Sequence, residues 1–162
     1  MTVVRTAVFP HDAAAVSALI GDYLRRTESE KAERGLASPG APLAARYVRE
    51  IEDPVRAFAA DRVLIAALDG VDCGIVVVHT SPEGAELSRF WTSPAARGRG
   101  VGSALLDAAL SKTATRVRLS VWRWRDDPVR LYLRRGFEVV ASWDDRPDLL
   151  CLERPAPLSA RP

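Results

Sequence analysis

The chain has 162 residues, 48% of them hydrophobic, which is enough for one domain with a buried core. Its 23 Lys and Arg residues nearly balance its 21 Asp and Glu residues, so the net charge of +2 predicts no nucleic-acid partner. No apolar run has the length of a membrane span and the first residues lack signal-peptide anatomy, so we expect no membrane partner and a cytoplasmic location.

The first half of the chain predicts a strand, two helices and a hairpin. Helical spacing of apolar residues begins after His11 or Asp12, either of which could cap the helix, and ends near Arg26. The polar, Gly- and Pro-rich stretch 27–42 predicts a loop or a frayed helix end. The expected strands are 2–8, 63–68 and 73–79, the last two joined by Asp69-Gly70. A second helix starts near Pro42, and Asp53-Pro54 stops it or turns it into another short helical piece.

The second half alternates strands and helices. A third antiparallel strand is expected over 86–92, followed by a helix that begins in a glycine-rich turn. The remaining predicted elements are a strand at 116–121, a short helix at 128–134, and strands at 137–143 and 149–153. We expect a single domain over 1–154 and a disordered tail over 155–162.

Cysteine and histidine usage favours neither a disulfide framework nor a metal centre. Cys73 and Cys151 lie in apolar, strand-like runs, which is typical of small buried thiols. His11 and His79 have no cysteine or carboxylate at ligand spacing, so we expect no metal.

The glycine-rich turn 97–102 is the strongest functional signal. Its three glycines remove the Cβ atoms that would keep a ligand away from backbone N–H groups, and the free N–H groups of the following helix would point into the turn. Such a turn predicts an anion site, and a diphosphate is the usual anion large enough to use several donors. The residues expected at the site are Arg97, Gly98, Arg99, Gly100, Val101, Gly102 and Ser103.

The spacing of the turn fits neither of two common nucleotide motifs. No Lys follows the glycines, as a P-loop requires, and Ser103 stands where a dinucleotide fingerprint needs Gly or Ala. The turn instead resembles motif A of the GNAT superfamily of acyl-CoA-dependent N-acetyltransferases, here Arg97-x-x-Gly100-x-Gly102 after a strand that ends in Pro94.

A second segment, 131–137, reads Leu-Tyr-Leu-Arg-Arg-Gly-Phe and resembles motif B of the same family, Leu-Tyr-x-x-x-Gly-Phe. The resemblance extends over about 2–153, in pattern only for the first half. It implies an α/β (α+β) GNAT fold: a mixed, mostly antiparallel sheet of six to seven strands flanked by about four helices, in the order β-α-α-β-β-β-α-β-α-β-β.

The resemblance also implies acetyl-CoA as co-substrate, and direct transfer of the acetyl group to a primary amine of a small molecule or peptide in a ternary complex. Tyr132 matches the motif B tyrosine that protonates the departing thiolate. Glu86, eleven residues before Arg97, stands where members with a carboxylate base carry a Glu. A backbone N–H near Phe90 would polarise the thioester carbonyl, and Thr92 would pair with the pantetheine arm.

Several alternatives stay open. Arg125 replaces an Asn common in the family, and could meet a phosphate or pair with Asp126 or Asp127. A catalytically silent acyl-CoA sensor, or an α/β domain without CoA, would share much of the pattern, and a homodimer is possible by analogy. The acidic and aromatic residues expected near the acceptor would suit a polyamine or aminoglycoside-like amine, although amino acids and peptide N-termini remain open: Glu28, Glu30, Glu33, Tyr47, Trp143, Asp144, Asp145 and Asp148.

Overall fold

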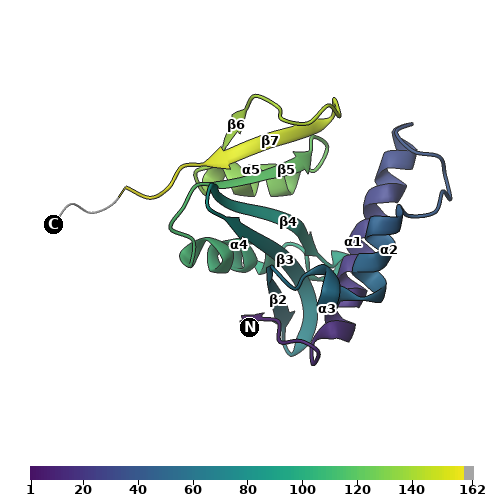
Figure 1. Cartoon of the computed structure of the whole chain (residues 1–162), viewed down its shortest axis with the longest axis horizontal. Coiled ribbons are helices and arrows are strands. Elements are labelled where there is room, and N and C mark those ends of the chain that lie inside the picture. The colour runs from purple at the N-terminus through teal and green to yellow at the C-terminus, as the bar shows by residue number, and fades with distance from the viewer. Residues whose placement is uncertain (159–162) are drawn as a thin grey trace.

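A seven-stranded sheet with helices on both faces forms the protein, as seen in a computed structural model that describes residues 1–158 (Figure 1). The strand order is β1-β2-β3-β4-β5-β7-β6, and only the β4–β5 pair is parallel. This confirms the mixed, mostly antiparallel sheet. The strands are β1 (Thr2–Thr6), β2 (Arg62–Leu68), β3 (Val71–Ser81), β4 (Gly84–Thr92), β5 (Val117–Trp122), β6 (Glu138–Val140) and β7 (Leu149–Arg154).

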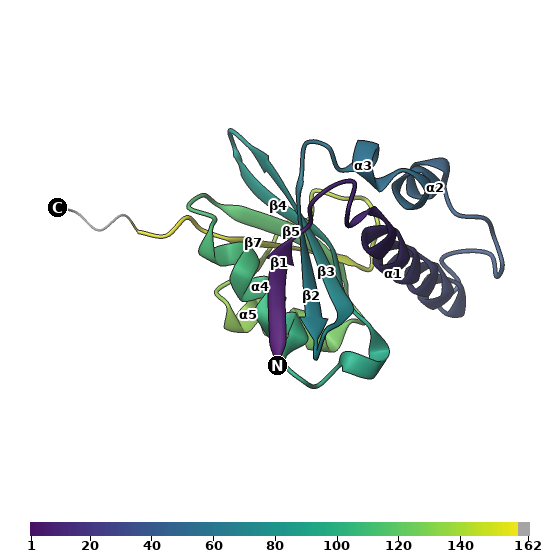
Figure 2. The ribbon, with the colours of Figure 1, turned by 90° about the horizontal axis from the view of Figure 1, so that it is seen from below.

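Helices α1, α2 and α3 cover one face of the sheet, whereas α4 and α5 cover the other (Figure 2). The helices are α1 (Ala13–Glu33), α2 (Ala45–Glu52), α3 (Pro54–Ala57), α4 (Val101–Ser111) and α5 (Asp126–Arg134), with a 3-10 turn, η1 (Pro94–Ala96). The expected element order is therefore confirmed, α3 is the short helical piece that is one of the two alternatives at Asp53-Pro54, and η1 is added. None of the helices in residues 1–158 is long and apolar enough to cross a membrane.

Helix α1 is longer than the sequence pattern predicts, because it runs to Glu33 instead of ending near Arg26. Its polar last turns are held by tertiary contacts. Glu30 accepts hydrogen bonds from the indole N–H of Trp124 at 2.8 Å and from Nε of Arg125 at 3.2 Å. Trp124 and Arg125 are more than 90 residues away from Glu30 in the sequence, so local periodicity could not reveal these contacts.

The last hairpin is shorter than the sequence predicts, because β6 ends at Val140 and the chain then turns. Ser142 Oγ donates to the backbone oxygen of Asp144, and Asp144 in turn accepts hydrogen bonds from the backbone N–H and the guanidinium of Arg146. These local side-chain bonds replace the sheet ladder over this stretch.

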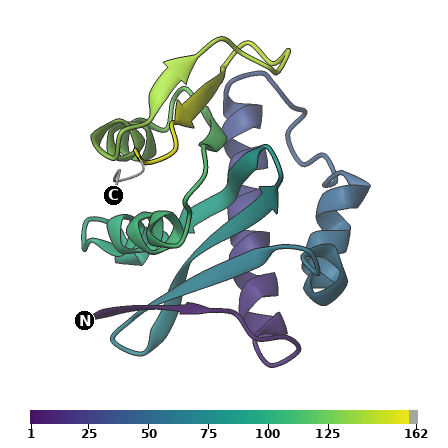
Figure 3. The ribbon, with the colours of Figure 1, turned by 60° about the vertical axis from the view of Figure 1, so that its left-hand side comes forward.

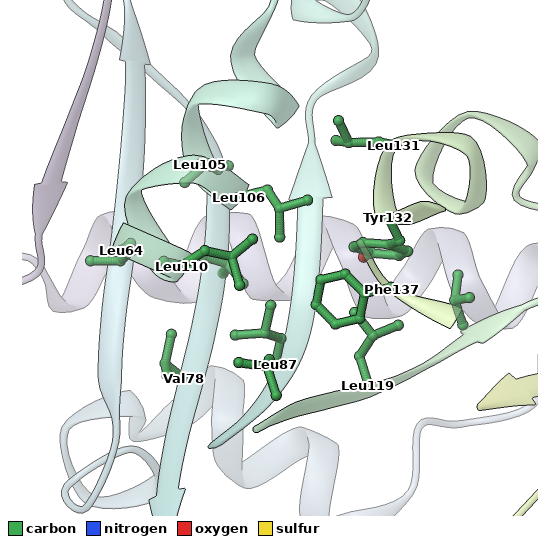
Figure 4. Packing of buried hydrophobic residues seen from close by; sticks show 14 of the residues in the cluster. Leu64, Val78, Leu87, Leu105, Leu106, Leu110, Leu119, Leu131, Tyr132 and Phe137 are labelled. Atoms are coloured by element: carbon green, nitrogen blue, oxygen red, sulfur yellow. The ribbon is translucent and has the colours of Figure 1, made fainter. Parts of the chain in front are cut away.

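The core has two halves, one on each face of the sheet, because alternate residues of the central strands point to opposite faces. Under α1 the cluster includes Val16, Ile20, Ile65, Ile75 and Trp91. Under α4 and α5 it includes Leu64, Val78, Leu105, Leu119 and Phe137 (Figure 4). Cys73 and Cys151 are both buried free thiols, as expected.

Strands β4 and β5 part soon after they begin. Only two residue pairs, Ala85 with Val117 and Glu86 with Arg118, are in register between them. Further along β4 a bulge places two residues, Arg89 and Phe90, opposite one residue of β3. The half of the sheet with β1 to β4 therefore diverges from the half with β5 to β7, a division visible in Figure 3.

Asp12 precedes α1, but its side chain makes no capping hydrogen bond to that helix. It accepts instead from the backbone N–H of Val8 at 2.8 Å and from Arg5 at 3.1 Å. The Val8 N–H, and next the Arg5 guanidinium, lower the pKa of Asp12 against the opposing effect of burial. Asp12 therefore joins β1 to the start of α1 through an ionised carboxylate.

Replacing Asp12 with Ala should lower the free energy of unfolding by about 2 kcal/mol at pH 7, because Val8 N–H and Arg5 lose a charged partner. The folded-state pKa of Asp12 lies below its ordinary value, so this stabilisation is present above about pH 4 and is lost as the pH falls through the folded-state pKa. Urea unfolding measures this: the difference in free energy of unfolding between the variant and wild type should be smaller at pH 3 than at pH 7. An equal difference at both pH values would contradict this role.

Residues 155–158 form neither helix nor strand. The rest of the tail that the sequence predicts to be disordered, 159–162, lies outside the described residues.

Candidate active site

A cleft of about 730 Å³ opens beside the glycine-rich turn, between the end of β4, α1, α4 and α5. It contains most of the residues that the sequence predicts for the cofactor. The predicted residues on its wall are Phe90, Thr92, Arg97, Gly98, Gly100, Val101, Gly102 and Ser103. We call this space the cofactor cleft.

The turn has the backbone conformation that its glycines predict. Gly98 and Gly100 have φ of 74° and 81°, in the left-handed region that favours glycine. Gly100 is the N-cap of α4, no side chain caps this helix end, and the first helical N–H to bond within the helix is that of Ala104. The N–H groups of the first turn of α4 are thus available at the cleft, where the helix dipole also favours an anion.

The two arginines of the turn differ in their placement. Arg97 lines the cleft, where its guanidinium lies 4.8 Å from the ring centre of Trp91 and donates to the backbone oxygen of Thr92 at 3.1 Å. Burial, and next the positive charge of neighbouring arginines, lowers the pKa of Arg97. Arg99 does not line the cleft and faces Asp69, with 3.5 Å between Nη2 and the carboxylate.

A second cavity of about 340 Å³ lies between α1, α2 and the diverging strands β4 and β5. We call it the acceptor pocket. Three residues, Phe90, Arg125 and Pro128, line both this pocket and the cofactor cleft. The two spaces therefore meet at the bulge of β4, where the sheet divides.

Tyr132 lies at the acceptor pocket and is only 3% exposed. Its ring packs between Phe90 and Phe137, with centroid distances of 5.6 and 5.7 Å. Figure 4 shows Tyr132 next to Phe137. Tyr132 therefore also packs α5 against its neighbours, whereas the adjacent Leu133 is 47% exposed. Burial raises the pKa of Tyr132, so its hydroxyl stays protonated and can donate a proton.

Glu86 also lines the acceptor pocket, from the start of β4. Its side chain is 46% exposed, and it accepts a hydrogen bond from Nε of Arg118 at 3.0 Å. The desolvated setting expected for a base is therefore absent in this arrangement, although the carboxylate does reach the pocket.

Arg125 pairs with neither Asp126 nor Asp127, so that expectation is wrong. It bonds to Glu30 and donates to Thr27 Oγ1 at 2.7 Å, both on α1. Burial opposes ionisation of Glu30, but the hydrogen bonds and charge of Arg125 prevail and lower the pKa of Glu30. Glu30 thus supports the wall between the two spaces and is not free to bind an amine.

Sequence reasoning missed several arginines of the cofactor cleft, namely Arg26, Arg34, Arg130 and Arg134. Two of them had a signal: Arg130 and Arg134 are four positions apart on α5, on either side of the motif B tyrosine, and such spacing puts them on one helix face. Arg34 reaches the cleft only through the extension of α1, whereas Arg26 lies where the sequence pattern already places the end of that helix.

Fold comparison relates the chain to known acetyltransferases along almost its whole length. A protein described as histone acetyltransferase HPA2 and related acetyltransferase, from Corynebacterium glutamicum, superposes with a TM-score of 0.71 at 20% identity, covering 99% of each chain. A GNAT-family acetyltransferase from Streptococcus pneumoniae superposes with a TM-score of 0.64 at 21% identity, covering 97% of this chain and 100% of that one. An acetyltransferase from Streptococcus agalactiae superposes with a TM-score of 0.66 at 16% identity, covering 95% of this chain and 98% of that one.

Sequence comparison agrees with the fold. The profile of the Acetyltransferase (GNAT) domain family matches residues 59–139, which is half of the chain and includes both motifs and Tyr132. No curated protein matches the chain by sequence. The parted strands, the glycine-rich turn and the helix N-terminus thus define an acetyltransferase fold, and the chain belongs to the GNAT acetyltransferase family.

Proposed function

We propose that the protein transfers an acetyl group from acetyl-CoA to a primary amine by direct attack in a ternary complex. The observation that carries this proposal is the meeting of the cofactor cleft and the acceptor pocket at Phe90, beside Tyr132. A thioester entering from one side and an amine from the other would come into contact there. Bringing two reactants together in this way is itself a large part of catalysis.

The diphosphate of CoA would be bound by the first N–H groups of α4, with Arg130 and Arg134 of α5 on the opposite wall of the cleft. When bound, the cofactor supplies the activated acetyl group.

The reaction needs a neutral amine, a polarised carbonyl and a protonated leaving thiol. In our proposal Glu86 removes the ammonium proton, directly or through water. The amine nitrogen then forms a bond to the acetyl carbon, whose carbonyl oxygen is stabilised by a backbone N–H at Phe90. The carbon–sulfur bond breaks, and Tyr132 donates its proton to the thiolate. The second proton that the attacking nitrogen loses on forming the amide returns to the Tyr132 oxygen through water, and Glu86 releases its proton to solvent.

Replacing Gly100 with Ala should weaken CoA binding about tenfold. A Cβ at this φ of 81° strains the N-cap and turns the first N–H groups of α4 away from the diphosphate, at a cost of about 1.4 kcal/mol. Titration calorimetry with CoA measures the effect. Gly40→Ala is a matched control, because Gly40 has a φ of 70° and no neighbour within 4 Å, outside the cleft. Equal affinities in both variants would contradict the proposed diphosphate site.

Replacing Glu86 with Gln should lower kcat severalfold at pH 7, because the amine must then lose its proton without help. The loss should shrink as the pH approaches about 10, where a free alkyl amine is largely neutral. The pH profile of both proteins measures this. A loss that does not vary with pH would show that Glu86 acts in binding and not as the base.

A further inference from the structure

The wall of the acceptor pocket carries more positive than negative charge. Its two carboxylates are Glu28 and Glu86, whereas its five cationic side chains are Lys31, Arg46, Arg89, Arg125 and Arg146. A polyamine would meet repulsion from such a wall. The excess of positive charge indicates an anionic group on the molecule that enters.

The carboxylates that pair with two of these arginines lie behind the wall. Glu50 accepts from Nε and Nη2 of Arg89 at 2.9 and 2.6 Å, and Asp144 accepts from Nε and Nη2 of Arg146 at 2.9 and 2.8 Å. Neither Glu50 nor Asp144 lines the pocket. Each pair fixes its guanidinium through Nε and Nη2, and within residues 1–158 the Nη1 group of each arginine makes no hydrogen bond.

Arg46 adds a positive charge beside Arg89. Both guanidinium groups lie near the ring of Tyr47, at 4.6 Å for Arg46 and 5.3 Å for Arg89. Arg46 forms no ion pair with a carboxylate in the described part of the chain, so its charge is not compensated locally. An anion near Tyr47 would therefore be attracted by two guanidinium groups at once.

Arg89 combines a strained backbone with a position on the pocket wall next to the junction of the two spaces. Arg89 has a φ of 53°, in the left-handed region that a residue with a Cβ rarely adopts, and it lies in the bulge of β4. Phe90, the next residue, is where the pocket meets the cofactor cleft. A ligand held by Arg89 would thus lie close to the point of acetyl transfer.

We propose that the acceptor is a small amine that also carries an anionic group, a carboxylate or a phosphorus oxyanion, bound by Arg46, Arg89 and Arg146. An amino acid has this chemistry. The inference rests on the proposed acetyl transfer and names the class of amine. It also replaces the hypothesis of a cationic acceptor, because only Glu28 of the six acidic residues behind that hypothesis lines the pocket. Several of the six are paired, among them Glu28 with Lys31, Glu30 with Arg125, and Asp144 with Arg146.

Matched pairs of amines test the inference. Each α-amino acid in a panel is compared with the amine formed by removing its carboxyl group, and an aminoalkylphosphonate is added to test the second kind of anion. Thiol release from acetyl-CoA gives kcat/KM for each compound, and calorimetry with the CoA-loaded protein gives affinity without turnover. We expect at least a tenfold preference for the anionic member of the pair in both measurements.

Two variants locate the anion site. Arg46→Gln removes an exposed guanidinium and is compared with Arg49→Gln, which removes one from the same helix outside the pocket. The double variant Arg89→Gln, Glu50→Gln removes the second guanidinium without leaving a buried carboxylate unpaired. Each pocket variant should raise KM for the anionic amine at least fivefold, and more than it raises KM for the matched amine, whereas Arg49→Gln should not.

The outcomes separate this inference from the proposed function. Anionic amines that bind more tightly than their partners, with no acetyl transfer to any amine, would leave the anion site standing and refute the acetyltransferase proposal. Amines without an anionic group that bind or react as well as the amino acids and phosphonates would overturn the inference and leave acetyl transfer intact. Failure of every anionic amine to bind would also overturn it.

Discussion

Replacement of Tyr132 with Phe should lower kcat at least tenfold while CoA still binds with wild-type affinity. The variant keeps the ring that packs between Phe90 and Phe137 and loses only the hydroxyl. That hydroxyl stays protonated because burial raises the pKa of Tyr132, so it can supply the proton that the departing thiolate needs. A tenfold loss corresponds to about 1.4 kcal/mol of additional barrier.

The measurement for Tyr132→Phe is steady-state thiol release together with CoA titration and thermal unfolding. Retained folding and CoA binding with reduced kcat would place the loss in the transition state. Turnover equal to wild type would remove Tyr132 from the mechanism and leave it as a packing residue.

Replacement of Gly84 with Ala should lower the free energy of unfolding by at least ~3 kcal/mol. A Cβ at this position would lie 2.6 Å from the backbone oxygen of Arg116, and Gly84 has a φ of 148° that side chains rarely adopt. The neighbouring N–H of Ala85 donates to that same oxygen at 2.8 Å, which begins the short contact between β4 and β5. The substitution would therefore separate the two strands that frame the site.

Gly35→Ala separates this clash from simple backbone strain. Gly35 also has a positive φ, of 72°, but nothing lies within 4 Å of where its Cβ would stand. We expect this control to cost only about 1 kcal/mol. Urea unfolding of both variants measures the difference. If both variants lost the same free energy of unfolding, the close approach of the new Cβ to Arg116 would not be what destabilises Gly84→Ala.

The parts of the site that the sequence predicts are those built from local pattern. The glycine turn, the amphipathic helix after it and the tyrosine of motif B each lie within a few residues, so spacing alone indicates their conformation. The element order follows for the same reason. Gly98 and Gly100 are left-handed where the turn requires it, and Tyr132 lines the acceptor pocket beside Phe90, where the two spaces meet.

The parts that escaped prediction depend on distant contacts. The extension of α1 needs Glu30 to meet Trp124 and Arg125, and the orientation of Arg89 needs both the bulge in β4 and Glu50 from α2. Neither the bulge nor a pairing of this kind has a local signature. The sequence shows the acidic residues expected near the acceptor, but it does not show which arginines pair with them. The sign of the charge on the pocket wall therefore could not be predicted.

Acetyl transfer to an amine is the central claim, and an assay of thiol release from acetyl-CoA across the panel of amines tests it most directly. We expect release that depends on the amine, matched mole for mole by an acetylated amine in mass spectrometry. Tight binding of CoA with no amine-dependent release from any member of the panel would contradict the claim and indicate an acyl-CoA-binding sensor with the same fold.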